Sequence, residues 1–216
     1  MEQDDIFECY EGDRWFERNS GLLTPHDDHV IFLLELYGVL SPDVKVLEIG
    51  AANGYRLARI YEKYGCEVHA VEPSKKAVED GKTRFPYMHF YPRALKDIDF
   101  DEMFDIVIVQ SVFHWIDRKN LLLSASNIDR SLRARGKLVI GDFQTPFPVK
   151  RRYHHIEDKE VYTYKLRYKD IFLSTGSYIE LSATAINHDE KSFKNITLGN
   201  VFVLSLLSKE GIYTDL

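Results

Sequence analysis

The chain is poor in the features that mark several large classes of protein. It has two cysteines, Cys9 and Cys66, among 216 residues, which excludes a framework of several disulfides or a cysteine-rich zinc site. No apolar run reaches the roughly 20 residues that a membrane-spanning helix needs, and the acidic start, residues 1–5, is unlike a signal peptide. Positive charge is scarce, because 28 Lys and Arg face 34 Asp and Glu, a net charge of −6. We therefore expect a soluble cytoplasmic protein with no membrane partner and no general nucleic-acid binding.

What the chain does contain is an alternation of short apolar runs and helical patterns. Predicted strands cover residues 45–49, 67–71, 88–91, 104–109 and 137–141, and predicted helices cover residues 55–64, 74–84 and 118–134, the last ended by Gly136. An earlier helix is expected to begin at Thr24-Pro25. Strands that alternate with helices form a parallel sheet covered on both faces. Two later runs, residues 178–186 and 200–207, are joined by a polar loop, which favours an antiparallel hairpin.

A turn with two glycines after the first predicted strand is the strongest indication of function. Gly50 lets the chain leave the strand sharply, and Gly54 lets the next helix approach a ligand closely. Glu72 ends the second strand, where a carboxylate can accept both hydroxyls of a ribose. Glu48, at the end of the first strand, suits a cationic group such as an ammonium better than a pyrophosphate. The pattern predicts a site for an adenosine-containing cofactor, whereas the structural alternative is an ordinary βα turn with Glu72 as a helix-start charge.

The spacing Glu48-x-Gly50-x-x-x-Gly54 resembles motif I of the class I S-adenosylmethionine-dependent methyltransferases, although Ala52 stands where many members carry glycine. The resemblance covers residues 44–142 and is carried by an ordered set of motifs. It implies an α/β, Rossmann-like fold with a seven-stranded, mostly parallel sheet, helices on both faces and an antiparallel C-terminal strand. It also implies S-adenosyl-L-methionine as cofactor and S-adenosyl-L-homocysteine as product. The cofactor-binding residues implied are Glu48, Gly50, Ala52, Asn53, Gly54, Glu72, Pro73, Ala94, Leu95, Gln110 and Ser111.

The resemblance leaves the methyl acceptor open. Compact segments on either side of the matched core favour a small-molecule substrate, with a hydroxyl oxygen of a sugar, nucleotide-linked or other biosynthetic intermediate as the first expectation. Methylation of nitrogen in a small molecule or protein is the alternative. Candidate substrate-binding residues are Tyr10, Arg14, Trp15, Trp115, Asp142, Arg151 and Arg152, and candidate catalytic bases are His114, His154 and His155. Each histidine also has a structural explanation, as a capping, packing or surface residue.

Three other interpretations remain beside this one. A nucleotide-dependent oxidoreductase is disfavoured by Glu48 and by the absence of Gly-x-Gly-x-x-Gly and Tyr-x-x-x-Lys. A methyltransferase-like subunit that binds without catalysis is opposed by the intact glycines and Glu72. The His26–His29 stretch superficially suggests a metal site, but its acids are better explained as helix-start residues, and we expect no metal. The simplest organisation is a single domain with a helical cap (1–40), a cofactor-binding core (44–142) and a substrate-side segment with a hairpin (143–216).

Overall fold

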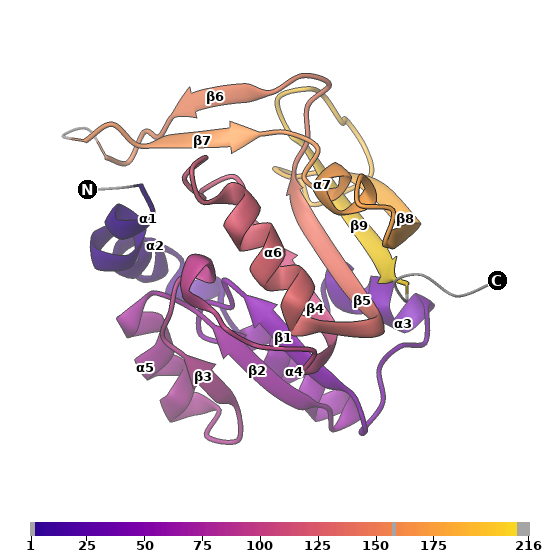
Figure 1. Cartoon of the computed structure of the whole chain (residues 1–216). Helices are drawn as coiled ribbons and strands as arrows, with labels where there is room; N and C mark the ends of the chain where they lie inside the picture. The colour runs from indigo at the N-terminus through magenta and orange to yellow at the C-terminus, as the bar shows by residue number, and fades with distance from the viewer. Residues whose placement is uncertain (1–2, 157–158, 211–216) are drawn as a thin grey trace.

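The computed structural model describes residues 3–156 and 159–210, and its centre is a seven-stranded sheet (Figure 1). The strands are β1 (Lys45–Ile49), β2 (Glu67–Val71), β3 (His89–Tyr91), β4 (Phe104–Gln110), β5 (Leu132–Phe143), β8 (Tyr178–Asn187) and β9 (Val201–Lys209). They lie in the order β3-β2-β1-β4-β5-β9-β8. Strands β1 to β5 are parallel, and β9 runs antiparallel to both β5 and β8. The predicted mostly parallel sheet with an antiparallel C-terminal strand is confirmed.

The strand order reverses between β1 and β4, and this reversal positions the site. In open α/β sheets, ligands bind outside the carboxyl ends of the strands at such a reversal. Here Ile49 at the end of β1 is in register with Val109 of β4. The loops that begin at Gly50 and at Ser111 therefore leave the sheet side by side.

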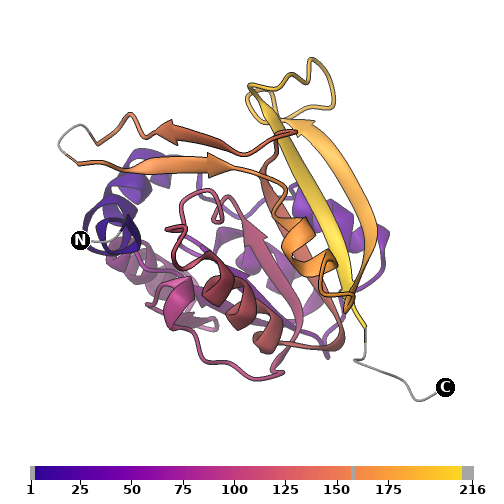
Figure 2. The ribbon, with the colours of Figure 1, turned by 45° about the horizontal axis from the view of Figure 1, so that its top comes forward.

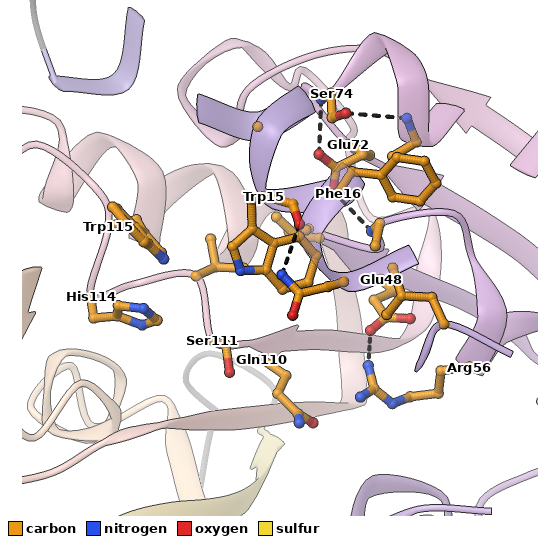
Figure 3. A pocket seen from close by; sticks show the side chains of 18 of the residues that line it. Trp15, Phe16, Glu48, Arg56, Glu72, Ser74, Gln110, Ser111, His114 and Trp115 are labelled. Carbon is orange, nitrogen blue, oxygen red and sulfur yellow. Dashed lines mark hydrogen bonds and ion pairs between the residues drawn. The ribbon is translucent and has the colours of Figure 1, made fainter. Parts of the chain in front are cut away.

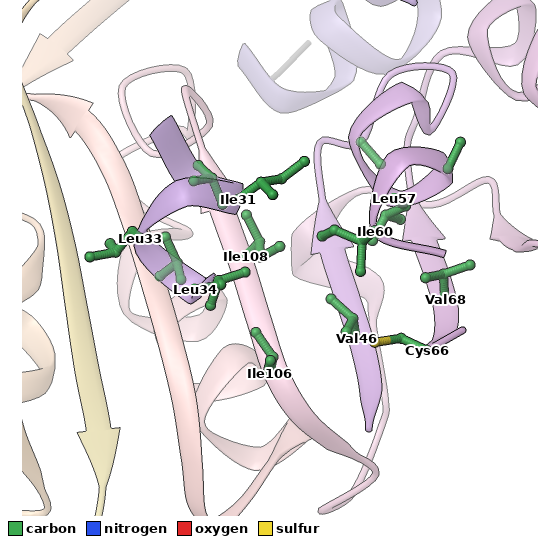
Figure 4. Close-up of a cluster of buried hydrophobic side chains, with 14 of the residues drawn as sticks. Ile31, Leu33, Leu34, Val46, Leu57, Ile60, Cys66, Val68, Ile106 and Ile108 are labelled. Atoms are coloured by element: carbon green, nitrogen blue, oxygen red, sulfur yellow. The ribbon is translucent and has the colours of Figure 1, made fainter. Parts of the chain in front are cut away.

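Helices cover both faces of the sheet because the strand side chains alternate between them. On one face, α3 (His29–Leu36) and α4 (Tyr55–Tyr64) pack against β-strand residues such as Val46, Ile106 and Ile108 (Figure 4). On the other face, α6 (Leu121–Ser131) and α7 (Lys169–Leu173) pack against Val107 and Val109. Each fully buried Leu, Ile or Val contributes roughly 1.5–3 kcal/mol of transfer free energy, so these two clusters hold the strand ends in place.

Two predicted helix boundaries are wrong. Helix α3 begins at His29, not at Thr24-Pro25, because Asp28 is its N-cap and accepts hydrogen bonds from the backbone N–H of Val30 and Ile31, both at 3.0 Å. Helix α6 ends at Ser131, and the chain continues directly into β5.

Gly136 therefore does not end a helix. It lies within β5 beside Arg135, whose φ is +65°, and the pairing of β5 with β4 shifts register between Phe104 and Ile106. The shift and the left-handed residue are the marks of a β-bulge. The polar stretch before the predicted strand at 137–141 is therefore irregular strand, not helix.

Two further segments lie over the carboxyl ends of the strands. One is an N-terminal cap, residues 3–22, made of α1 (Gln3–Ile6), η1 (Phe7–Glu11), α2 (Gly12–Asn19) and η2 (Ser20–Leu22). The other is a hairpin of β6 (Val149–Arg152) and β7 (Tyr162–Lys165), which sequence patterning does not predict because three of the four residues of β6 are basic. Gln3 joins the two segments: its side chain donates to Tyr162 O at 2.8 Å and accepts from Tyr162 N at 2.9 Å. Figure 2 shows the hairpin reaching from β8 and β9 toward the cap.

The remaining described elements are α5 (Lys75–Arg84), which follows β2, and the short η3 (Leu95–Asp97), which follows β3. Within residues 3–156 and 159–210, no helix combines the length and apolarity that crossing a membrane requires.

Candidate functional site

A cavity of about 1070 Å³ lies between the carboxyl edge of the sheet, the N-terminal cap and the hairpin. Its lining includes the loops that follow β1, β2, β3 and β4, residues of the cap, and the ends of β5, β8 and β9. Pockets for a single drug-sized ligand span about 300–1,000 Å³. The cavity is therefore large enough for two small molecules side by side.

The two glycines of the turn are required by the packing of the protein itself. Gly50 has a φ of +71°, and a Cβ there would collide with Cγ2 of Val112, from the loop after β4. Gly54 has a φ of +80°, and a Cβ there would lie 2.5 Å from Sδ of Met88. Gly54 was expected to permit close approach of a ligand, but what approaches it is the Met88 side chain.

Three non-glycine residues in the cavity lining also adopt left-handed backbone conformations, and two of them, Ala52 and Ser111, lie in the loops after β1 and β4. Ala52 has a φ of +51° and Ser111 a φ of +58°. Such conformations are uncommon for residues with a Cβ and concentrate at functional sites. The value at Ala52 also gives a physical reason why glycine suits this position of the turn.

Glu72 is held in place by two backbone donors. Its Oε2 accepts from Ala52 N at 2.9 Å, and its Oε1 accepts from Ser74 N at 2.8 Å. Burial raises the pKa of the Glu72 carboxyl to about 7, against the lowering effect of these two hydrogen bonds. A carboxylate oxygen has more than one lone-pair site, so each oxygen can still accept a hydrogen bond from a hydroxyl group of a ligand in the cavity.

Glu48 has a buried partner that sequence patterning did not reveal. Nη1 of Arg56, in the first turn of α4, contacts Oε1 of Glu48, and Nε of Arg56 donates to Oδ2 of Asp28 at 2.6 Å. Burial raises the pKa of the Glu48 carboxyl to about 7, and Arg56 acts against that rise. The sequence signal for this ion pair was weak: Arg56 precedes Leu57 in the first turn of α4, and both residues are buried.

Two acceptor atoms on this side of the cavity are buried without a partner among the described residues. They are Oε2 of Glu48 and Oε1 of Gln110, and both residues line the cavity. An unpaired buried acceptor is costly, and an ammonium group, which only donates, would satisfy both atoms. Together with Glu72, these atoms fit a ligand that carries an ammonium group and a ribose.

The structure brings most of the predicted cofactor residues to one cavity. Those in its lining are Glu48, Gly50, Ala52, Glu72, Pro73, Ala94, Leu95, Gln110 and Ser111. Asn53 instead donates to Leu23 O at 3.2 Å and to Oδ2 of Asp80 at 2.7 Å, so its side chain ties the turn to the cap and to α5.

His114 and Asp142 form a buried pair on another side of the cavity. Nδ1 of His114 lies 2.9 Å from Oδ1 of Asp142, whose Oδ2 accepts from His114 N at 3.1 Å. Phe143 N also donates to Asp142, at 2.7 Å. A carboxylate only accepts, so Nδ1 carries a hydrogen, and in the neutral imidazole the lone pair is on Nε2. Figure 3 shows His114 and Trp115 across the cavity from Glu72.

The other candidate catalytic and substrate residues divide into two groups. Trp15, Trp115 and His155 line the cavity, as does Tyr153 beside them. Asp142 acts on His114 and is 3% exposed, so it is placed to orient that residue.

The second group lies away from the lining. Arg14 stacks on Tyr10 with its guanidinium 3.8 Å from the ring centroid. Arg151 and Arg152 are exposed on β6, and His154 is exposed and packs against His155. The exposed basic run of β6 therefore offers a ligand in the cavity no direct contact.

Three residues away from the cavity have the composition of a metal site. Ligand atoms of Glu67, His69 and His89 all lie within 4.8 Å of one another, on β2 and β3. Nε2 of His69 already lies 2.8 Å from Oε1 of Glu67, and its Nδ1 lies 3.1 Å from the Tyr91 hydroxyl. Hydrogen bonds thus account for the buried imidazole without a metal.

Comparison with known sequences finds similarity to methyltransferases. Residues 46–136 match the family model described as a methyltransferase domain. An uncharacterized methyltransferase of Alkaliphilus oremlandii is 28% identical over 151 residues, which are 63% of this chain and 68% of that protein. A sarcosine/dimethylglycine N-methyltransferase of Halorhodospira halochloris is 31% identical over 111 residues, which are 48% of this chain but only 39% of that protein.

Solved structures share the fold at low sequence identity. The 1,6-didemethyltoxoflavin-N1-methyltransferase of Burkholderia thailandensis, with 1,6-didemethyltoxoflavin and S-adenosylhomocysteine bound, gives a TM-score of 0.64 at 14% identity over 83% of this chain and 76% of that chain. The N-methyltransferase NodS of Bradyrhizobium japonicum, in complex with S-adenosylhomocysteine, gives a TM-score of 0.59 at 16% identity over 89% and 86% of the two chains. At these identities the likeness shows the fold alone.

Proposed function

We propose that the chain is a class I S-adenosylmethionine-dependent methyltransferase and that it methylates a hydroxyl oxygen of a small molecule, which His114 deprotonates. The observation that carries the proposal is the buried His114–Asp142 pair, 2.9 Å apart, in the same cavity as Glu72. A base fixed in this way serves an acceptor that must lose a proton before it can act as a nucleophile. We also propose that residues 1–216 work as one domain, with the cap and the hairpin on the acceptor side.

The cofactor-binding side would hold S-adenosylmethionine through its two ends. Glu72 would accept hydrogen bonds from the ribose hydroxyls, and Glu48 and Gln110 would accept from the ammonium group. Ala94 and Leu95 would lie against the adenine. When bound, the cofactor supplies a methyl group on a positively charged sulfur, which is already a strong electrophile.

The residues of the chain would position the methyl acceptor, exclude water from the cavity and accept a proton. The cap covers the cavity, so that Glu72 is 6% and His114 is 7% exposed, which keeps water from competing as a nucleophile. Nε2 of His114 takes the acceptor proton, and Asp142 stabilises the imidazolium that results. General base catalysis of this kind is typically worth 10²–10⁴ in rate.

N-methylation is the second candidate, because relatives carry that activity in their names. The Halorhodospira halochloris protein is a sarcosine/dimethylglycine N-methyltransferase, and two proteins of the same fold are N-methyltransferases. His114 would then remove a proton from an ammonium or ring N–H group. A non-catalytic binding subunit is a third possibility, and it predicts cofactor binding without turnover.

Calorimetry with S-adenosylhomocysteine tests the proposed cofactor site. The folded protein is expected to bind it, and Glu72→Ala should weaken binding at least tenfold because charged hydrogen bonds are worth about 1.5–3 kcal/mol. Glu79→Ala, an exposed glutamate on α5, is the matched control and should bind like the unaltered protein. Absence of binding to the unaltered, folded protein would refute the proposal.

Mass spectrometry of methylated products then separates oxygen from nitrogen. Amine products alone would replace the first candidate by the second. Binding of S-adenosylhomocysteine without any methyl transfer, across hydroxyl and amine acceptors, would favour the non-catalytic subunit.

A further inference from the structure

We propose that the acceptor is an uncharged aromatic alcohol, a phenol, whose ring lies among Trp115, Tyr153 and Phe143 with its hydroxyl at Nε2 of His114. The inference rests on the proposed function and deepens it by naming the class of substrate. It narrows the expectation from sequence, which put sugars and nucleotide-linked intermediates first.

The walls around His114 are aromatic. Ring centroids of His114 lie 5.3 Å from Phe143 and 5.5 Å from Trp115. Trp115 in turn packs edge-on against Tyr153, at 4.2 Å and an interplanar angle of 80°, and lies 5.2 Å from Phe7. All five residues line the cavity. A flat ring inserted here would find offset-stacked and edge-to-face partners, the arrangements that aromatic pairs prefer.

One polar side chain near these walls, that of Asn187, is already in use. The side-chain nitrogen of Asn187 donates to the carbonyls of Lys194 and Asn195, and its Oδ1 accepts from Asp189 N and Glu190 N. A sugar here would lose the water around its hydroxyls and gain no hydrogen bond from Asn187 in return, which is unfavourable.

Several charged side chains of the lining also have partners of their own. Arg18 pairs with Glu11, and Glu8 lies 3.8 Å from Lys96. Asp4 accepts hydrogen bonds from Asp117 N and from Asn120. Lys191, on the exposed loop between β8 and β9, is a lining cation that makes no ion pair with any described carboxylate. A charged amine would thus have to compete with existing partners for Asp4 and Glu11.

The acidity of a phenol also matches an imidazole base. A phenolic hydroxyl has a pKa of about 10, whereas an aliphatic hydroxyl is close in acidity to water, at about 15.7. Imidazole is a base of moderate strength, so it can accept a proton from a phenol far more readily than from a sugar. The aromatic walls and the buried His114–Asp142 pair point to the same substrate class.

The test measures binding of model acceptors to protein saturated with S-adenosylhomocysteine. The probes are 4-nitrophenol, cyclohexanol, glucose and sarcosine. Calorimetry measures the binding of each, and for 4-nitrophenol the absorbance of its phenolate is measured as well. We expect 4-nitrophenol to bind most tightly and to shift toward the phenolate spectrum on binding. Equal or tighter binding of glucose or sarcosine would overturn the proposal.

Variants test whether the aromatic walls bind 4-nitrophenol and whether His114 takes its proton. Trp115→Ala should weaken 4-nitrophenol binding at least tenfold, whereas Trp115→Phe, which keeps a ring, should retain most of it. His114→Gln should bind 4-nitrophenol but lose the spectral shift. Phe147→Ala, which removes an exposed ring outside the lining, is the matched control and should change neither property. If 4-nitrophenol binding is the same in Trp115→Ala and in the control, the proposed acceptor position is wrong.

The same samples separate this inference from the proposed function. If S-adenosylhomocysteine fails to bind, the proposed function fails. If it binds and 4-nitrophenol does not, only the aromatic acceptor is refuted.

Discussion

The two sides of the cavity are built in different ways. On the cofactor side, Glu72 follows β2 and is held by backbone N–H donors from the loops after β1 and β2. On the His114 side, the walls come from the loop after β4, the end of β5 and the hairpin, and they meet through side chains. A local sequence pattern can specify the first kind of site. The second kind requires segments that are distant in sequence to converge, so it can change its substrate while the cofactor side stays the same.

The largest expected effect is on catalysis, from a variant that alters only the His114 side of the cavity. His114→Gln removes the proposed base and should lower kcat by about 10²–10⁴ while S-adenosylhomocysteine affinity stays within a few fold. Steady-state kinetics and calorimetry on the same preparation check the two halves of this prediction. A parallel loss of cofactor affinity would mean that the two sides are not separable.

Asp142→Asn probes the residue that orients His114. An amide can donate to Nδ1, which would place the hydrogen on Nε2 and block its use as a base. We expect kcat to fall nearly as far as in His114→Gln, with a changed pH profile. An unchanged pH profile would assign Asp142 a purely structural role.

The next effect concerns stability on the cofactor side. Gly50→Ala adds a Cβ against Val112 in a left-handed conformation and should cost roughly 2–4 kcal/mol of the free energy of unfolding. Gly176→Ala is the control, because its φ is +73° but nothing lies within 4 Å of the added Cβ; it should cost only about 1–2 kcal/mol. Urea unfolding measures both. Adding Val112→Ala to Gly50→Ala should recover part of the loss, and no recovery would contradict the collision.

A pH dependence should follow from Glu72. Its pKa lies at about 7 in the folded protein, above the ordinary value of 4.5, so the folded state binds this proton more tightly than the unfolded chain. The contribution of Glu72 to stability therefore declines as pH rises from 4.5 to about 7. Ribose hydroxyls need the ionised carboxylate, so S-adenosylhomocysteine affinity should rise as pH increases through the same upper range.

Calorimetry between pH 5.5 and 8.5, conditions chosen to bracket a pKa of about 7, measures this dependence. The affinity should change by up to about tenfold per pH unit below the pKa, the limit for one linked proton. Glu72→Gln has no such proton and should bind weakly with a flatter profile. A profile as steep as that of the unaltered protein would assign the dependence to another group.

The smallest expected effect tests how the cap is attached to the cofactor side. Oδ1 of Asp13, in α2, accepts from Oγ of Ser74 at 2.7 Å and from Lys76 N at 3.1 Å. Asp13→Ala should weaken the attachment of the cap to α5 by about 1 kcal/mol. It should therefore speed S-adenosylhomocysteine release severalfold, as stopped-flow fluorescence can measure. Glu17→Ala removes an exposed ion pair with Lys76 and should have almost no effect. Equal release rates in both variants would show that Asp13 does not restrain the cap.

The sequence by itself determined the alternation of strands and helices from β1 to β5, the turn at Gly50 and the position of Glu72, because these depend on periodicity and spacing within short segments. The fold predicted from them is confirmed, whereas the roles of individual site residues stay predictions. Only the tertiary structure showed that Arg56 contacts Glu48, that Asp142 holds His114, and that an unpredicted hairpin brings Tyr153 to Trp115. These contacts join residues from separate elements, and no local pattern encodes them, since they form only when the β4 and β5 ends and the hairpin are brought together by the folded core.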